Sequence, residues 1–141
     1  MGDPESTLTE EAELVDQVEL RLGAQLEHLS VVRAVAAHIA MGADFDIDAI
    51  ADLKLAVDEV CTDLIVRAVP GSAMDCVFRL SPDRIEACVR VTSHNDDLPK
   101  RDSFGWTVLT TLTDSVSTRL ESVDGHYVIQ VDIAKNRTAT T

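Results

Sequence analysis

Basic residues are scarce in this chain. Over 141 residues, 12 Lys and Arg stand against 25 Asp and Glu, which gives a formal net charge of −13 at pH 7. Nucleic-acid binding needs clustered Lys and Arg to neutralise phosphates, so this balance argues against direct contact with DNA or RNA. The charge permits attraction of a basic protein partner, although it also serves solubility alone.

Long apolar runs are absent too, and none reaches the roughly 18 residues that a membrane-spanning helix needs. The first residues, MGDPESTLTEEAE, are acidic and lack the basic end and apolar stretch of a secretory signal. We therefore expect a cytoplasmic protein with no membrane contact. The apolar content of 45% and the length of 141 residues suit one globular domain with a core of its own.

Cysteine is also rare, and the three thiols have no C-x-x-C spacing, so neither a disulfide framework nor a zinc site is indicated. The runs MDCVFRL and RIEACVRV predict a β-hairpin in which Cys76 faces Val89 and Cys88 faces Val77. Because side chains alternate along strands, Cys76 and Cys88 then point to opposite faces and cannot bond. We expect these thiols and Cys61 to be reduced and to act as small hydrophobes.

The spacing of apolar residues predicts the element order β-α-α-β-β-α-β-β. We expect Asp46 or Asp48 to cap the second helix, Ser103 to cap the third, and Asp124-Gly125 to turn the last hairpin. This order favours an α+β fold, a two-layer α/β sandwich with a mixed sheet covered on one face by three helices. Residues 1–12 are expected to be disordered, residues 13–134 to form the domain and residues 135–141 to be a flexible tail. The predicted elements are strands 16–22, 74–80, 84–91, 115–122 and 127–133, and helices 26–41, 48–68 and 104–114.

The second predicted helix carries an acidic stripe beside its apolar one. Its apolar residues recur with spacings of 3 and 4, while Asp52, Ala56, Glu59 and Asp63 lie roughly a quarter turn away. Like charges four residues apart cost a helix only about 0.2–0.5 kcal/mol, so a solvated acidic edge is one interpretation. The other is a site where a carboxylate meets a divalent cation or activates a hydroxyl. Spacing alone leaves both open.

Three segments resemble a known family. LKLAVDEVCTDLI resembles the helix that carries the magnesium-binding motif in the ATP-binding fold of gyrase, Hsp90, sensor histidine kinases and MutL. FGWTVLTTLTDSVS and VDGHYVIQVDI resemble the closing helix and hairpin of its anti-sigma branch. The resemblance covers about residues 13–134 and is closest to actinobacterial anti-sigma factors of the RsbW type with serine kinase activity. It implies the histidine kinase-like ATPase fold.

The resemblance also implies roles for particular residues. Glu59 matches the general base that polarises an acceptor serine, and Asp63 matches the magnesium-binding asparagine. Gly105 falls in the segment whose main-chain N–H groups meet the phosphates of ATP. Such proteins form homodimers, sequester an alternative sigma factor of a stress or sporulation type, and are displaced by an anti-anti-sigma protein. The kinase then phosphorylates that antagonist, using ATP and Mg²⁺.

The nucleotide motifs depart from the family pattern. Ser93 stands where an aspartate reads adenine, and Asn95 stands where the first glycine of the motif should be. Phe104 and Trp106 flank the single glycine of the shortened lid, which crowds the approach of phosphate to the backbone. These departures predict that ATP and Mg²⁺ binding is weak or absent while the scaffold is kept.

Arg33, on the first predicted helix, lies on the surface where this family contacts its sigma factor and its dimer mate. It is a candidate partner contact, or else a solvated arginine paired with an acid such as Glu27.

Three functions remain open at this point. The first is an anti-sigma factor, the second a working ATP-dependent serine kinase, and the third a small-molecule sensor on the same scaffold with an apolar pocket at the adenine position.

Overall fold

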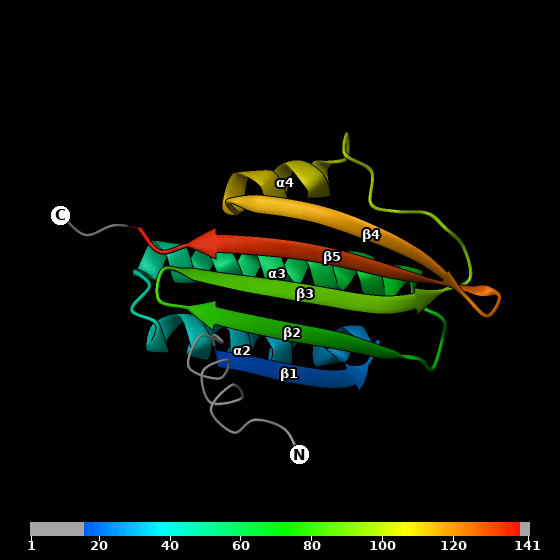
Figure 1. Ribbon diagram of the computed structural model, residues 1–141, viewed down its shortest axis with the longest axis horizontal. Helices are drawn as coiled ribbons and strands as arrows, with labels where there is room; N and C mark the ends of the chain where they lie inside the picture. Colours follow the sequence, from blue (N-terminus) through cyan, green and yellow to red (C-terminus); the bar gives the residue numbers. More distant parts are fainter. Residues whose placement is uncertain (1–15, 139–141) are drawn as a thin grey trace, which may run out of the picture.

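The computed structural model describes residues 16–138, and it shows a five-stranded sheet with helices on one face (Figure 1). The predicted disorder of residues 1–12 lies outside the described residues. The predicted elements are all present, with shifts of a few residues at their ends. They are β1 (Asp16–Gly23), the short 3₁₀ helix η1 (Leu26–His28), α2 (Leu29–Gly42), α3 (Ile47–Arg67), β2 (Ala73–Ser81), β3 (Arg84–Ser93), α4 (Phe104–Leu112), β4 (Ser115–Val123) and β5 (His126–Asn136).

The sheet has the strand order β1-β2-β3-β5-β4, and each pair of neighbours is antiparallel. The α+β sandwich is therefore confirmed, but the expectation of a mixed sheet was wrong. The chain leaves β3, forms α4, and returns as β4 at the edge, which places β5 between β3 and β4. β3 and β4, which run in the same direction, are thus separated by β5 and do not pair.

The predicted hairpin register is confirmed residue for residue. Cys76 faces Val89 and Cys88 faces Val77, so Cys76 points into the core and Cys88 to the open face of the sheet. All three thiols are free. Cys61 on α3 lies against Cys76 on β2, and a hydrogen bond between the two thiols, followed by burial, raises the pKa of Cys61 far above its ordinary value.

The core lies between α2 and α3 and the inner face of the sheet. Its largest fully buried side chains come from both layers. They are Phe78, Leu53, Leu64, Met74, Ile85, Ile129, Ile133, Val32, Val57, Val60, Val89 and Val91.

The start of α3 is fixed by Asp46. Its Oδ1 accepts a hydrogen bond from the backbone N–H of Ala49 at 2.7 Å, so the cap is Asp46 and not Asp48.

The end of β5 extends beyond the predicted domain boundary at residue 134. The backbone N–H of Asn136 donates to Asp114 Oδ2 at 2.7 Å, and that of Arg137 donates to the Asp83 carbonyl at 2.7 Å. Residues 135–137 are therefore held to the domain, while residues 139–141 lie outside the described part. Within residues 16–138, no helix is long and apolar enough to cross a membrane.

Candidate functional site

The acidic stripe of α3 faces α4 and a hollow beneath it. Ala56 is completely buried, while Glu59 and Asp63 are partly buried, so the stripe is only partly exposed to solvent. The hollow has a volume of about 370 Å³ and lies between α3, the segment 97–103 and the start of α4. It is lined by Glu59, Val60, Asp63, Arg67, Asp97, Leu98, Pro99, Lys100, Ser103, Gly105, Trp106, Leu109 and Val131.

Glu59 lies directly against Gly105 in the first turn of α4. A Cβ atom on residue 105 would collide with Glu59 Oε1 and would stand 3.3 Å from its carboxyl carbon. Ser103 begins this helix as predicted, because its Oγ accepts a hydrogen bond from the backbone N–H of Trp106 at 3.1 Å. The glycine therefore allows α4 to approach α3 closely at this carboxylate.

Asp63 is held by Arg67, one helical turn further along α3. Arg67 Nε donates to Asp63 Oδ2 at 3.2 Å, and Nη2 lies 3.4 Å from Oδ1. Arg67 Nη1 also donates to the backbone carbonyl of Asp97 at 2.6 Å. Sequence reasoning missed Arg67, although an acid followed by arginine four residues later is a recognisable helix pair.

The far end of the acidic stripe is held by Lys135 of β5. Its Nζ donates to Asp52 Oδ2 at 3.2 Å and to the Leu112 carbonyl at 2.9 Å. One ammonium group therefore connects α3, the last turn of α4 and β5, with its side chain only 16% exposed. It fixes the C-terminal end of α4 over the stripe and so positions the wall of the hollow.

The structure does not bring Ser93 and Asn95 into the wall of this hollow. Ser93 is completely buried at the end of β3, and its Oγ accepts a hydrogen bond from the Asn95 backbone N–H at 3.3 Å. Asn95 Oδ1 accepts in turn from the backbone N–H of Asp97 at 3.1 Å. Both side chains serve the turn after β3. Of the predicted nucleotide residues, Glu59, Asp63 and Gly105 line the hollow.

Arg33 on α2 is partly exposed and paired. Its Nη2 lies 2.9 Å from Asp58 Oδ1 on α3, with side-chain exposures of 43% and 33%. The paired acid is therefore Asp58, where the sequence had suggested Glu27. This ion pair connects the two long helices at their outer surface.

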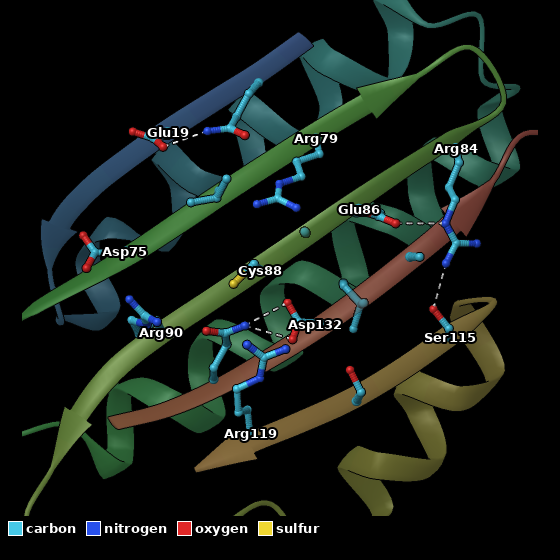
Figure 2. Close-up of a pocket in the computed structure, with 17 residues that line it drawn as sticks. Glu19, Asp75, Arg79, Arg84, Glu86, Cys88, Arg90, Ser115, Arg119 and Asp132 are labelled. Carbon is cyan, nitrogen blue, oxygen red and sulfur yellow. Dashed lines mark hydrogen bonds and ion pairs between the residues drawn. The ribbon is translucent and has the colours of Figure 1, made fainter. Parts of the chain in front are cut away.

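A second hollow, of about 580 Å³, lies on the open face of the sheet (Figure 2). It holds none of the predicted site residues. Gln130 Nε2 donates to both carboxylate oxygens of Asp132, at 3.2 and 3.0 Å, and Arg84 contacts Glu86 and Ser115. Burial, followed by the nearby Asp132 carboxylate, raises the pKa of Cys88 to about 12. The thiol is therefore protonated and unreactive at neutral pH.

The fold, with three helices on one face of an antiparallel sheet, is that of a known domain family. Residues 22–131 match the model of the histidine kinase-like ATPase domain family, and the chain belongs to this family. It is 40% identical over 104 residues to the anti-sigma-F factor RsbW of Mycobacterium tuberculosis, a match that covers 74% of this chain and 62% of that relative. It is 30% identical over 79 residues to the serine-protein kinase RsbW of Bacillus cereus, covering 55% of this chain and 49% of that relative.

Two solved structures share the fold. The SiaB–SiaC complex from Pseudomonas aeruginosa contains a chain that matches with a TM-score of 0.70 at 8% identity, covering 95% of this chain and 99% of that chain. The RsbU and RsbW domains of a Mycobacterium tuberculosis protein match with a TM-score of 0.55 at 15% identity, covering 89% of this chain and 35% of that one. The matches cover 62% and 49% of the lengths of these two curated relatives, so the chain spans less than two thirds of either.

The family implies a nucleotide ligand, but the α3 hollow does not fit magnesium-bound ATP as it is arranged. Both oxygens of Asp63, the residue that the resemblance assigned to magnesium, face the guanidinium of Arg67, so a cation there would compete with this ion pair. Within residues 16–138, no group of three or more His, Cys, Asp or Glu side chains could hold a metal ion. Ser93, in place of the adenine-reading acid, is buried in the turn.

Proposed function

We propose that this chain is an anti-sigma factor that binds and sequesters an alternative sigma factor of a stress or sporulation type. An anti-anti-sigma protein releases the sigma factor by competing for the same chain, which acts as a cytoplasmic homodimer. The observation that carries the proposal is the 40% identity to an anti-sigma-F factor over 104 residues. The family model matches residues 22–131, which include both long helices.

The outer surface of the helices supports a protein partner. Val31 is 44% exposed and Met41 57% exposed on α2, and Leu26 just before it is 54% exposed. Val31, Ala34, His38 and Met41 recur with spacings of 3, 4 and 3, so they form one exposed stripe along α2. An exposed stripe with apolar side chains, on the helix that also carries Arg33 of the Arg33–Asp58 pair, is typical of a binding surface with a polar rim.

In vitro transcription tests this proposal. RNA polymerase carrying an alternative sigma factor from the same cells should lose activity when the purified chain is added, and polymerase with the housekeeping sigma factor should not. Val31→Glu should weaken the inhibition, because a charge would be buried in the interface. Val123→Glu is a matched control, since Val123 is 45% exposed but lies in the β4–β5 hairpin. Equal inhibition by both variants would remove the α2 surface from the proposal.

The second candidate is an ATP-dependent serine kinase that phosphorylates the anti-anti-sigma protein. Two observations favour it: Glu59, the predicted general base, lines the α3 hollow, and relatives at 30% identity are named serine-protein kinases. Transfer of radiolabelled phosphate to a serine of the antagonist would establish it. Glu59→Gln should then abolish the transfer while binding of the sigma factor stays unchanged.

A further inference from the structure

Arg67 makes three polar contacts that together close one end of the α3 hollow. Nε and Nη2 face the two carboxylate oxygens of Asp63, at 3.2 and 3.4 Å, and Nη1 donates to the Asp97 carbonyl at 2.6 Å. The Arg67 side chain is 22% exposed, so these contacts are partly shielded from water. The guanidinium thus connects α3 to the segment that follows β3.

A divalent cation at this position would need the oxygens that Arg67 holds. Mg²⁺ binds carboxylate and phosphate oxygens in near-octahedral geometry and is reluctant to give up its waters. A guanidinium carries one positive charge in a planar fork that matches the two oxygens of a carboxylate. At Asp63 the arginine therefore supplies the positive charge and the ligand contacts that the metal would otherwise supply.

The opposite wall of the hollow is arranged in a complementary way. Glu59 Oε1 lies against Gly105 in the first turn of α4, where a helix N-terminus favours a negative group. A bound phosphate would compete with this carboxylate for the same end of the helix. The Glu59 carboxylate therefore occupies the end of the helix that a phosphate would need.

We propose that Arg67 holds the position of the divalent cation in this pocket, so that magnesium-bound nucleotide is excluded until the Arg67–Asp63 pair opens. Opening the pair also releases the Asp97 carbonyl, and hence loosens the segment 94–103 that borders the hollow. The proposal concerns the pocket alone and does not depend on which partner the outer helices bind.

Binding of a fluorescent ATP analogue, measured with Mg²⁺ and again with EDTA, tests the proposal. The ratio of the two affinities isolates the contribution of the metal from the general attraction of phosphate to arginine. For the unaltered chain we expect no magnesium-dependent binding. For Arg67→Gln we expect magnesium to strengthen binding about tenfold, which corresponds to about 1.4 kcal/mol. Adding Asp63→Ala to Arg67→Gln should remove this gain, because Asp63 is the freed ligand.

Two further variants complete the experiment. Arg21→Gln also breaks an arginine–aspartate pair, with Asp75 at 3.5 Å on the open face of the sheet, and should leave the magnesium ratio unchanged. Arg67→Lys keeps the charge but lacks the planar fork that contacts both oxygens of Asp63, so it should give an intermediate ratio. It remains informative if Arg67→Gln does not fold. Amide exchange in residues 94–103 should be faster in both Arg67 variants than in the unaltered chain.

Magnesium-dependent binding by the unaltered chain that equals or exceeds that of the Arg67 variants would overturn the proposal. Absence of nucleotide binding in folded Arg67 variants would overturn it as well. Neither result bears on sigma-factor binding, which the transcription assay measures as a loss of RNA polymerase activity.

Discussion

Glu59 and Gly105 occupy adjoining space where α3 meets the first turn of α4. The carboxylate oxygen Oε1 takes the volume that a Cβ atom on residue 105 would need, and the carboxyl carbon would be 3.3 Å from that atom. The Glu59 carboxylate of α3 and the glycine in the first turn of α4 are therefore packed as a pair. A side chain at residue 105 requires the carboxylate to move.

This pair predicts a coupled response to Gly105→Ala. Alanine is favoured in helices over glycine, but here its methyl group must displace the Glu59 carboxylate. We expect Gly105→Ala to lower the free energy of unfolding by about 1 kcal/mol more in the unaltered chain than in a Glu59→Ala background, where the space is free. Urea denaturation of the four combinations measures this coupling. Equal effects in the two backgrounds would show that the contact has no energetic weight.

The cap of α3 gives a second prediction. Asp46 accepts the Ala49 N–H at 2.7 Å, whereas the side chain of Asp48 lies in the first turn, is exposed, and makes no hydrogen bond within the described residues. Asp46→Ala should lower the free energy of unfolding by about 1 kcal/mol, the usual loss for an N-cap. Asp48→Ala is the matched control and should cost less than about 0.5 kcal/mol, because it removes only a favourable interaction with the helix dipole. Similar losses for both would contradict the assignment of the cap.

Local patterns in the sequence predicted much of this fold, since caps, turns and hairpin register depend on residues close together in the chain. Ser103, Asp124-Gly125 and the pairing of Cys76 with Val89 follow from such short-range rules. The order of the strands in the sheet does not follow from such short-range rules. Alternation shows which face of a strand is buried but not which strand lies beside it, so the sheet was expected to be mixed and is antiparallel.

The α3 hollow was predicted only in part for the same reason. Glu59, Asp63 and Gly105 came from the resemblance, and the structure brings them together. Lys135 could not be foreseen, because its contacts with Asp52 and the Leu112 carbonyl join residues far apart in the chain. The family pattern placed Ser93 where an aspartate reads adenine, and the structure shows that this serine is completely buried at the end of β3.

Lys135 itself provides a third prediction. Its ammonium is 16% exposed and hydrogen-bonded to a carboxylate and a helix-end carbonyl. Lys135→Met should lower the free energy of unfolding by about 1–3 kcal/mol, since it leaves Asp52 and the end of α4 without their partner. Arg137→Gln breaks the exposed pair with Asp83, at 3.3 Å, and should cost at most about 1 kcal/mol. Urea denaturation compares them, and a larger loss at Arg137 would contradict this ranking.

The Cys88 thiol predicts how stability changes in alkali. Burial, and then the Asp132 carboxylate, raises its pKa from 9.0 to about 12 in the folded chain. Between these values the unfolded chain has lost the thiol proton and the folded chain retains it, so unfolding releases a proton and becomes easier as pH rises. The stabilisation is complete below about pH 9 and is lost as pH rises toward about 12. Denaturation across this range should therefore show a shallower decline for Cys88→Ala than for the unaltered chain. The pKa of Cys61 is raised as well, so the free energy of unfolding of the variant should still decline with pH. Parallel declines for the variant and the unaltered chain would refute the role of Cys88.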